Sequence, residues 1–133
     1  MQVSGQTADA IDPIRLSALL VGMAEDALAG LKTAQADVQN DPEYARFVTD
    51  AECVLNLARF YRTKLEAATE KGLYDEAGDA QHYDRMLQLD TESVSHYAAL
   101  AQLATQAYRH ATDLGYYYRW DVPGKGFEEE AAF

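Results

Sequence analysis

Apolar residues recur at alternating steps of four and three in three separate stretches of the chain. The first stretch contains Leu16, Leu20, Met23, Ala27, Gly30 and Ala34. The second contains Phe47, Ala51, Val54, Ala58, Tyr61, Leu65 and Ala68. The third contains Tyr83, Leu87, Asp90, Val94, Tyr97, Ala101, Ala104, Tyr108 and Ala111. This spacing places each set along one side of a helix, and no strand-like alternation competes with it. The pattern therefore predicts an all-α protein, an antiparallel three-helix bundle of up-down-up topology with an aromatic C-terminal tail.

Capping residues mark the ends of these helices. Asp12-Pro13 and Asp41-Pro42 each place a carboxylate before a proline that suits the first helical turn. Gly72 and Gly115 follow the second and third stretches, where glycine commonly ends a helix. We predict helices over residues 13–36, 42–71 and 79–114.

These helices define three segments of the chain. Residues 1–11 form a flexible N-terminal segment, residues 12–115 form the bundle domain, and residues 116–133 form the aromatic tail. The acidic end of the tail, from Phe127 to Phe133, resembles the first turn of a further helix that has been cut short. This end is consistent with a fragment of a longer protein, and the sequence leaves open whether the chain is one.

Composition narrows the function classes. The chain has 133 residues, a net charge of −11 and a single cysteine, Cys53. One cysteine allows neither an internal disulfide nor a thiolate zinc cluster, and its helical position favours a buried, inert thiol. The acidic charge opposes nucleic acid and anionic membranes, and the longest apolar stretch is interrupted by Glu25 and Asp26. We expect no nucleic-acid partner and no membrane insertion.

The helices carry few residues suited to catalysis. Asp90 is the carboxylate at an apolar-stripe position, and the predicted pairing brings it near Tyr61. We interpret both as structural polar residues, with Tyr61 or Arg62 as the hydrogen-bond partner of Asp90. A catalytic role for Asp90 is the alternative, but general acid–base chemistry would need a second carboxyl group aimed at the same substrate.

Histidine–carboxylate pairs are also incomplete as a metal site. Glu92 and His96 lie one helical turn apart, as do Asp79 and His82. Carboxylate-bridged di-iron bundles need Glu-x-x-His on two helices and a glutamate on each of two others, which this chain does not supply. We predict no catalytic residues, no metal and no cofactor.

The tail concentrates aromatic residues. Its candidate ligand-binding residues are Tyr116, Tyr117, Tyr118, Arg119, Trp120 and Asp121. One interpretation is that the tail folds back and covers the groove between the first and third helices. Another is that its aromatic faces stack on sugar rings while its polar groups bond hydroxyls. A third is a protein-docking patch, since Tyr, Trp and Arg dominate binding hot spots.

The stretch Ala58-Arg-Phe-Tyr-Arg-Thr-Lys-Leu-Glu-Ala-Ala68 resembles a pattern in helical accessory domains of large secreted polysaccharide-degrading proteins of the glycoside hydrolase type. The resemblance covers residues 12–115. It implies a non-catalytic module attached to a glycan-active enzyme, either a spacer or a carbohydrate-binding part. No catalytic residues carry over, because the pattern is structural.

Two functions follow. The first is a non-catalytic accessory module of an extracytoplasmic, glycan-active protein, whose partners are a neutral glycan or neighbouring domains of the parent. The second is a stand-alone helical bundle that acts in protein–protein interaction or homodimerisation. Location depends on the same choice: extracytoplasmic for a fragment of a secreted protein, otherwise cytoplasmic.

Overall fold

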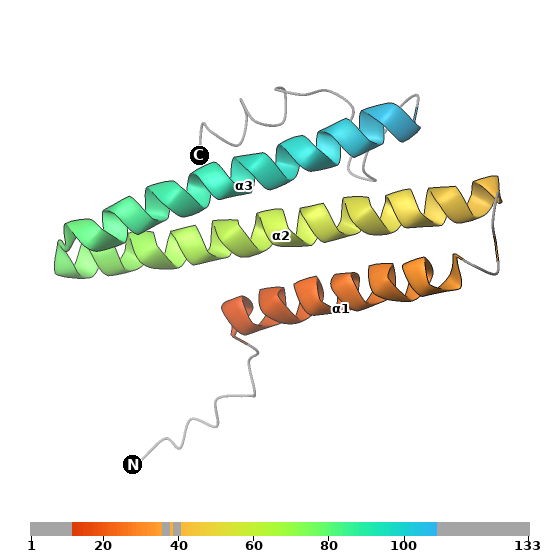
Figure 1. The fold of residues 1–133 in the computed structure, drawn as a ribbon. Coiled ribbons are helices and arrows are strands. Elements are labelled where there is room, and N and C mark those ends of the chain that lie inside the picture. Colours follow the sequence, from red (N-terminus) through yellow and green to blue (C-terminus); the bar gives the residue numbers. More distant parts are fainter. Residues whose placement is uncertain (1–11, 36–37, 39–40, 109–133) are drawn as a thin grey trace, which may run out of the picture.

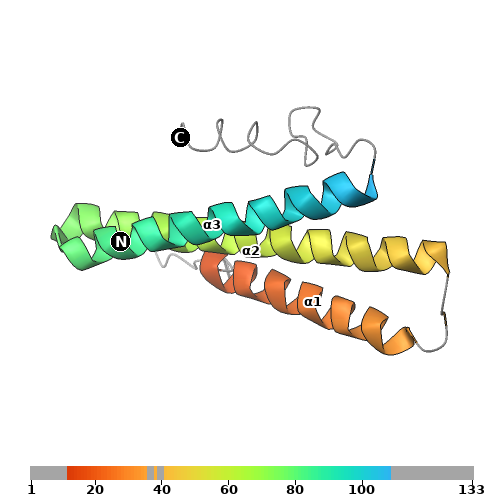
Figure 2. The ribbon, with the colours of Figure 1, turned by 45° about the horizontal axis from the view of Figure 1, so that its top comes forward.

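The structure, a computed structural model, describes residues 12–35, 38 and 41–108. It contains three helices, α1 (Pro13–Ala34), α2 (Pro42–Ala77) and α3 (Ala80–Ala107). The longest helix, α2, lies in the middle, with α1 along one side and α3 along the other (Figures 1 and 2). The prediction of an all-α, up-down three-helix bundle is confirmed for the described part of the chain.

Aspartate caps begin all three helices. The Oδ1 atom of Asp12 accepts a hydrogen bond from the amide of Ile14 at 3.0 Å, and that of Asp41 accepts one from Glu43 at 2.8 Å. Asp79 caps α3 in the same way, through the amide of Gln81 at 2.9 Å. Each carboxylate satisfies an amide that has no partner inside its helix.

The C-terminal ends differ from the predicted ones. α1 ends at Ala34 instead of residue 36. The prediction that α2 ends at Gly72 is wrong, because α2 continues to Ala77 and the left-handed cap is Gly78 at φ 69°. A glycine inside a helix costs only about 1 kcal/mol, which packing against a neighbouring helix readily offsets. α3 ends at Ala107 and not at residue 114, because Tyr108 adopts extended backbone at φ −127°.

Two apolar clusters hold the helices together. Between α1 and α2, the cluster consists of Val21, Ala24, Leu28 and Leu55. Between α2 and α3, it consists of Cys53, Phe60, Tyr97 and Leu100, and the rings of Phe60 and Tyr97 lie 5.2 Å apart. α2 thus contributes to both clusters from opposite sides.

The apolar stripes predicted from the sequence are only partly buried in the structure. α1 buries Ser17, Val21, Ala24 and Leu28, each one position after a residue of its predicted stripe. Leu20 remains 50% exposed, and on α2 Val54 and Tyr61 remain 53% and 57% exposed. α3 follows the prediction more closely, since Tyr97, Ala101 and Ala104 are buried. The reason is the arrangement of the helices, in which α1 and α3 both pack chiefly against α2.

Candidate functional site

The two remaining sides of α2 differ in chemistry. On one side lie Phe47, Val54 and Tyr61, spaced seven residues apart and each more than half exposed. On the other lie Glu52 and Arg59, which form ion pairs with α1. The three-helix layer therefore has one apolar face and one polar face.

The apolar face extends onto both outer helices. On α1, Leu16, Leu20 and Met23 flank the buried stripe, and Leu16 and Leu20 line one groove together with Val54 and Tyr61 of α2. On α3, Arg85, Glu92 and His96 lie beside one edge of the buried stripe and line the polar side of the layer. Leu87 and Val94 lie beside the other edge of that stripe, on the apolar side. We define the apolar face by the eight exposed side chains of Leu16, Leu20, Met23, Phe47, Val54, Tyr61, Leu87 and Val94.

A groove of about 350 Å³ lies between α1 and α2 on this face. Its lining residues are Pro13, Leu16, Ser17, Leu20, Val54, Leu57, Ala58, Tyr61 and Leu65. The Ser17 hydroxyl donates to the carbonyl of Ile14 at 2.8 Å and so is already used within α1. Carbon atoms dominate the remaining lining, which suits apolar side chains of a protein partner.

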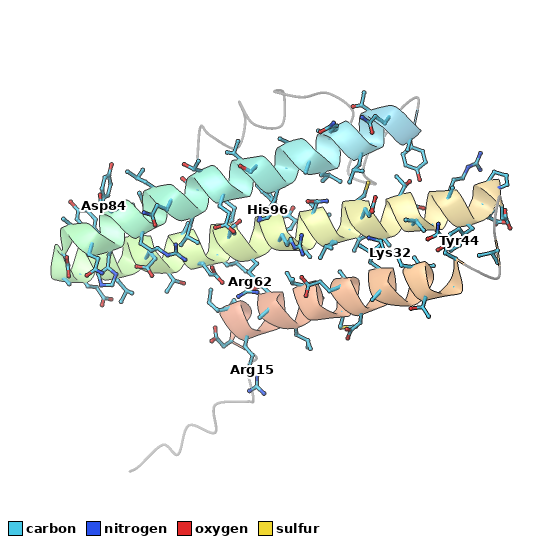
Figure 3. All side chains as sticks on the ribbon, viewed as in Figure 1. Arg15, Lys32, Tyr44, Arg62, Asp84 and His96 are labelled. Atoms are coloured by element: carbon cyan, nitrogen blue, oxygen red, sulfur yellow. The ribbon has the colours of Figure 1, made fainter. Side chains whose placement is uncertain are left out.

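The polar face holds a pocket of about 460 Å³. It is lined by Val21, Glu25, Arg59, Arg62, Thr63, Glu66, Arg85, Glu92 and His96. Arg62 of α2 and His96 of α3 both lie near the middle of the layer (Figure 3).

Charged groups of this pocket are used in ion pairs. Arg59 pairs with Glu25 of α1 at 2.8 Å, and Arg62 pairs with Glu66 at 2.9 Å. The Glu92–His96 spacing identified in the sequence brings Nε2 of His96 to 3.5 Å from Oε1 of Glu92. Over residues 12–108, excluding the undescribed positions of the first loop, no group of three or more His, Cys, Asp or Glu could hold a metal ion. These are separate, solvated ion pairs, of which Arg59–Glu25 joins α2 to α1 while the other two lie within one helix.

Of the predicted structural polar pair, Asp90 lies at the boundary of α2 and α3, whereas Tyr61 lines the groove between α1 and α2. Oδ1 of Asp90 accepts a hydrogen bond from Nζ of Lys64 at 3.2 Å, so the structure pairs it with Lys64. The sequence predicted Tyr61 or Arg62 as its partner. The Tyr61 ring packs edge-on against Phe60, with centroids 5.1 Å apart. Tyr61 therefore belongs to the apolar face.

The lone cysteine is buried, as expected from its helical position. Burial, together with the nearby carboxylates of Asp50 and Glu52, raises the pKa of the Cys53 thiol to about 11. The neutral thiol is a poor nucleophile. Near it, a hydrogen bond from the Tyr108 hydroxyl to Asp50 raises the pKa of Tyr108 to about 12. Both groups therefore remain protonated at neutral pH.

The predicted ligand-binding residues all lie outside the described part of the chain. These are Tyr116, Tyr117, Tyr118, Arg119, Trp120 and Asp121. Their role in binding a glycan stays a prediction. The apolar face, in contrast, was missed as a site although its residues were recognised as stripes, because each stripe was assigned to the core.

The comparisons with known proteins add no relative. The sequence matches no protein-family model, no curated protein and no solved structure. The resemblance to helical accessory domains therefore stays a prediction as well. Among the described helices, none is long and apolar enough to cross a membrane.

Proposed function

We propose that this chain is a helical protein-interaction module that docks helices of a protein partner on its apolar face. The observation that carries the proposal is the continuity of that face across three helices. Eight large apolar side chains, each about 40–60% exposed, gather on one side of the layer. Monomeric proteins rarely expose contiguous apolar patches above a few hundred Å², and larger patches mark interaction sites.

The spacing within the face indicates the kind of partner. Leu16 and Met23 are seven residues apart, as are Phe47, Val54 and Tyr61. A repeat of seven keeps side chains on one line along a helix and is the pattern that a second helix packs against. The groove between α1 and α2 would receive the side chains of such a helix.

The polar face gives less support for a function. Its arginines and glutamates are largely satisfied by each other, as in the Arg59–Glu25 and Arg62–Glu66 pairs. A ligand that displaced these pairs would have to replace interactions that the protein already makes. We therefore place the function on the apolar face.

Photo-cross-linking in the organism that makes the protein tests the proposal. Benzoylphenylalanine replaces Tyr61 on the apolar face or, as the matched control, Ala45 on the polar side of the same helix. We expect irradiation to attach protein at position 61, with mass spectrometry locating the attachment on an amphipathic helix, and to attach little at position 45. No adduct at position 61, or equal adducts at both positions, would contradict the proposal.

A further inference from the structure

We infer that the occupant of the apolar face is a second copy of this chain, packed face to face about a two-fold axis with the two α2 helices antiparallel. The inference rests on the proposed function and names its partner. It follows from the area of the face, the order of large and small residues along α2, and the distribution of charge.

The area matches what a stable dimer needs. The exposed parts of the eight side chains that define the face, about half of each, provide several hundred Å² of apolar surface per copy. A little over half of a standard interface is apolar, so this is the apolar surface that such an interface needs. A standard protein–protein interface buries about 800 Å² on each partner. A second three-helix layer presents the same spacing of apolar residues, so the exposed stripe of its α2 can pack against that of the first copy.

Residues along the exposed side of α2 are complementary to the same sequence read backwards. If the two-fold axis passes level with Asn56, Ala51 lies opposite Tyr61 of the second copy. In the same register Val54 lies opposite Ala58, and Phe47 lies opposite Leu65. Ala51 and Ala58 are partly buried against the α1–α2 cluster, and as small residues they leave room for Tyr61 and Val54 of the second copy. A two-fold interface needs self-complementarity of this kind.

Charge favours the apolar side over the polar side as the contact. The acidic residues of the pocket on the polar side, Glu25, Glu66 and Glu92, point away from a second copy docked on the apolar side. Lys64 and Asp90, at the boundary of α2 and α3, neutralise each other. The net charge of −11 per chain therefore opposes association least when the apolar faces meet.

A segment of the same chain is a less complete occupant. The 25 residues that follow position 108 form one continuous segment, which can fill the groove between two helices. The apolar face spans two such boundaries, from Leu20 on α1 to Val94 on α3. Contact of residues 109–133 with this face is therefore an outcome of the test that would overturn the inference.

Light scattering on the purified full-length chain tests the dimer. We expect a mass of twice 14.7 kDa at micromolar concentration. Val54→Lys places a charge at the centre of the interface and should raise the dissociation constant by roughly 100-fold, as expected for a buried hot spot. The matched control, Ala45→Lys on the polar side of α2, should leave it unchanged. Circular dichroism checks that both variants keep the helix content of the wild type.

Cysteine pairing tests the register. Ala51→Cys and Tyr61→Cys are prepared as separate chains, mixed and oxidised at a concentration where the wild type is dimeric. We expect a disulfide-linked species from the mixture and little from either variant alone, because two copies of the same position lie ten residues apart, roughly 15 Å along the helices. The wild type, with its buried Cys53, is the control for background.

The outcomes separate this inference from the proposed function. A monomer at every concentration overturns the dimer, and so does a dimer that Val54→Lys and Ala45→Lys affect equally. Attachment from position 61 to residues 109–133 of the same chain also overturns it. If the purified chain is monomeric while position 61 captures a helix of a different protein in the cell, the proposed function stands and the dimer fails.

Discussion

The two sides on which α2 meets its neighbours are built differently. Against α3, α2 packs Phe60 on Tyr97 and Leu100, the last of which is fully buried. Against α1, it packs Leu55 on small and medium aliphatic side chains, of which Leu28 is the largest. α1 is also shorter, at 22 residues against 28 in α3. The difference indicates that α2 and α3 form the more stable part of the layer, and that α1 is held by a smaller apolar interface.

This difference bears on the proposed interaction, because the groove on the apolar face lies between α2 and the more weakly held α1. A partner that packs on Leu16 and Leu20 of α1 together with Tyr61 of α2 would hold α1 in place. Binding to the folded state alone stabilises it by mass action. If the partner is a second copy, the free energy of unfolding depends on protein concentration, so variants are to be compared at one concentration.

The largest effect is expected from Phe60→Ala, at the α2–α3 interface. The ring is 3% exposed and contacts the rings of Tyr61 and Tyr97. Its removal should lower the free energy of unfolding by about 3–5 kcal/mol, the usual cost of truncating a buried aromatic residue. Urea denaturation followed by circular dichroism measures the change. A loss below about 1 kcal/mol would show that this aromatic cluster is not the main support of the layer.

A smaller effect is expected from Leu28→Ala, at the α1–α2 interface. Leu28 is 9% exposed and, next to Leu55, lines a second pocket of about 430 Å³ to which all three helices contribute, so neighbouring side chains can relax into the space it leaves. We expect a loss of about 2–3 kcal/mol, at the low end of the range for buried leucine. The same denaturation measurement checks it. A loss greater than that of Phe60→Ala would reverse the ranking of the two interfaces.

Much of the fold could be predicted from local sequence signals. The caps at Asp12 and Asp41 mark helix starts because the side-chain and backbone contacts of a cap involve neighbouring residues only. Helix ends were harder. Gly72 and Gly78 are both suitable caps by residue type, and the choice between them depends on how far α3 packs along α2, which is a long-range property.

Which stripe is buried could not be predicted from periodicity. In α1, the stripe of Leu16, Leu20 and Met23 is more apolar than the stripe of Ser17, Val21 and Ala24 that α2 covers. A flat layer leaves one side of every helix without a neighbour, so the more regular apolar stripe can remain at the surface. The regular spacing of this exposed stripe is what a partner helix would pack against.

Alkaline pH should weaken the α2–α3 side through Cys53. Burial raises the pKa of its thiol from 9.0 to about 11, so in the unfolded chain the proton is lost first. The stabilisation is fully present below pH 9 and disappears as the pH rises towards 11, a change on the order of 2 kcal/mol. Denaturation curves at several pH values measure it, and Cys53→Ala is the control that should remove this part of the slope. Identical slopes for the two proteins would contradict the prediction.

The smallest effects are expected from the ion pairs that cross the two interfaces. Arg59 pairs with Glu25 of α1 at 2.8 Å, and Lys64 pairs with Asp90 of α3 at 3.2 Å, all through side chains about 30–51% exposed. Because water and salt screen exposed charges, Glu25→Gln and Asp90→Asn should each lower the free energy of unfolding by less than about 1 kcal/mol.

Salt separates the contribution of these charges from that of packing. The loss caused by either substitution should shrink between roughly 0.05 M and 1 M sodium chloride, whereas the loss caused by Leu28→Ala should persist. Urea denaturation at both salt concentrations makes the comparison. If Glu25→Gln lowered the free energy of unfolding by about 2 kcal/mol or more at high salt, the Arg59–Glu25 pair would be a principal attachment of α1. The apolar cluster between α1 and α2 would then be insufficient to hold α1 without that pair.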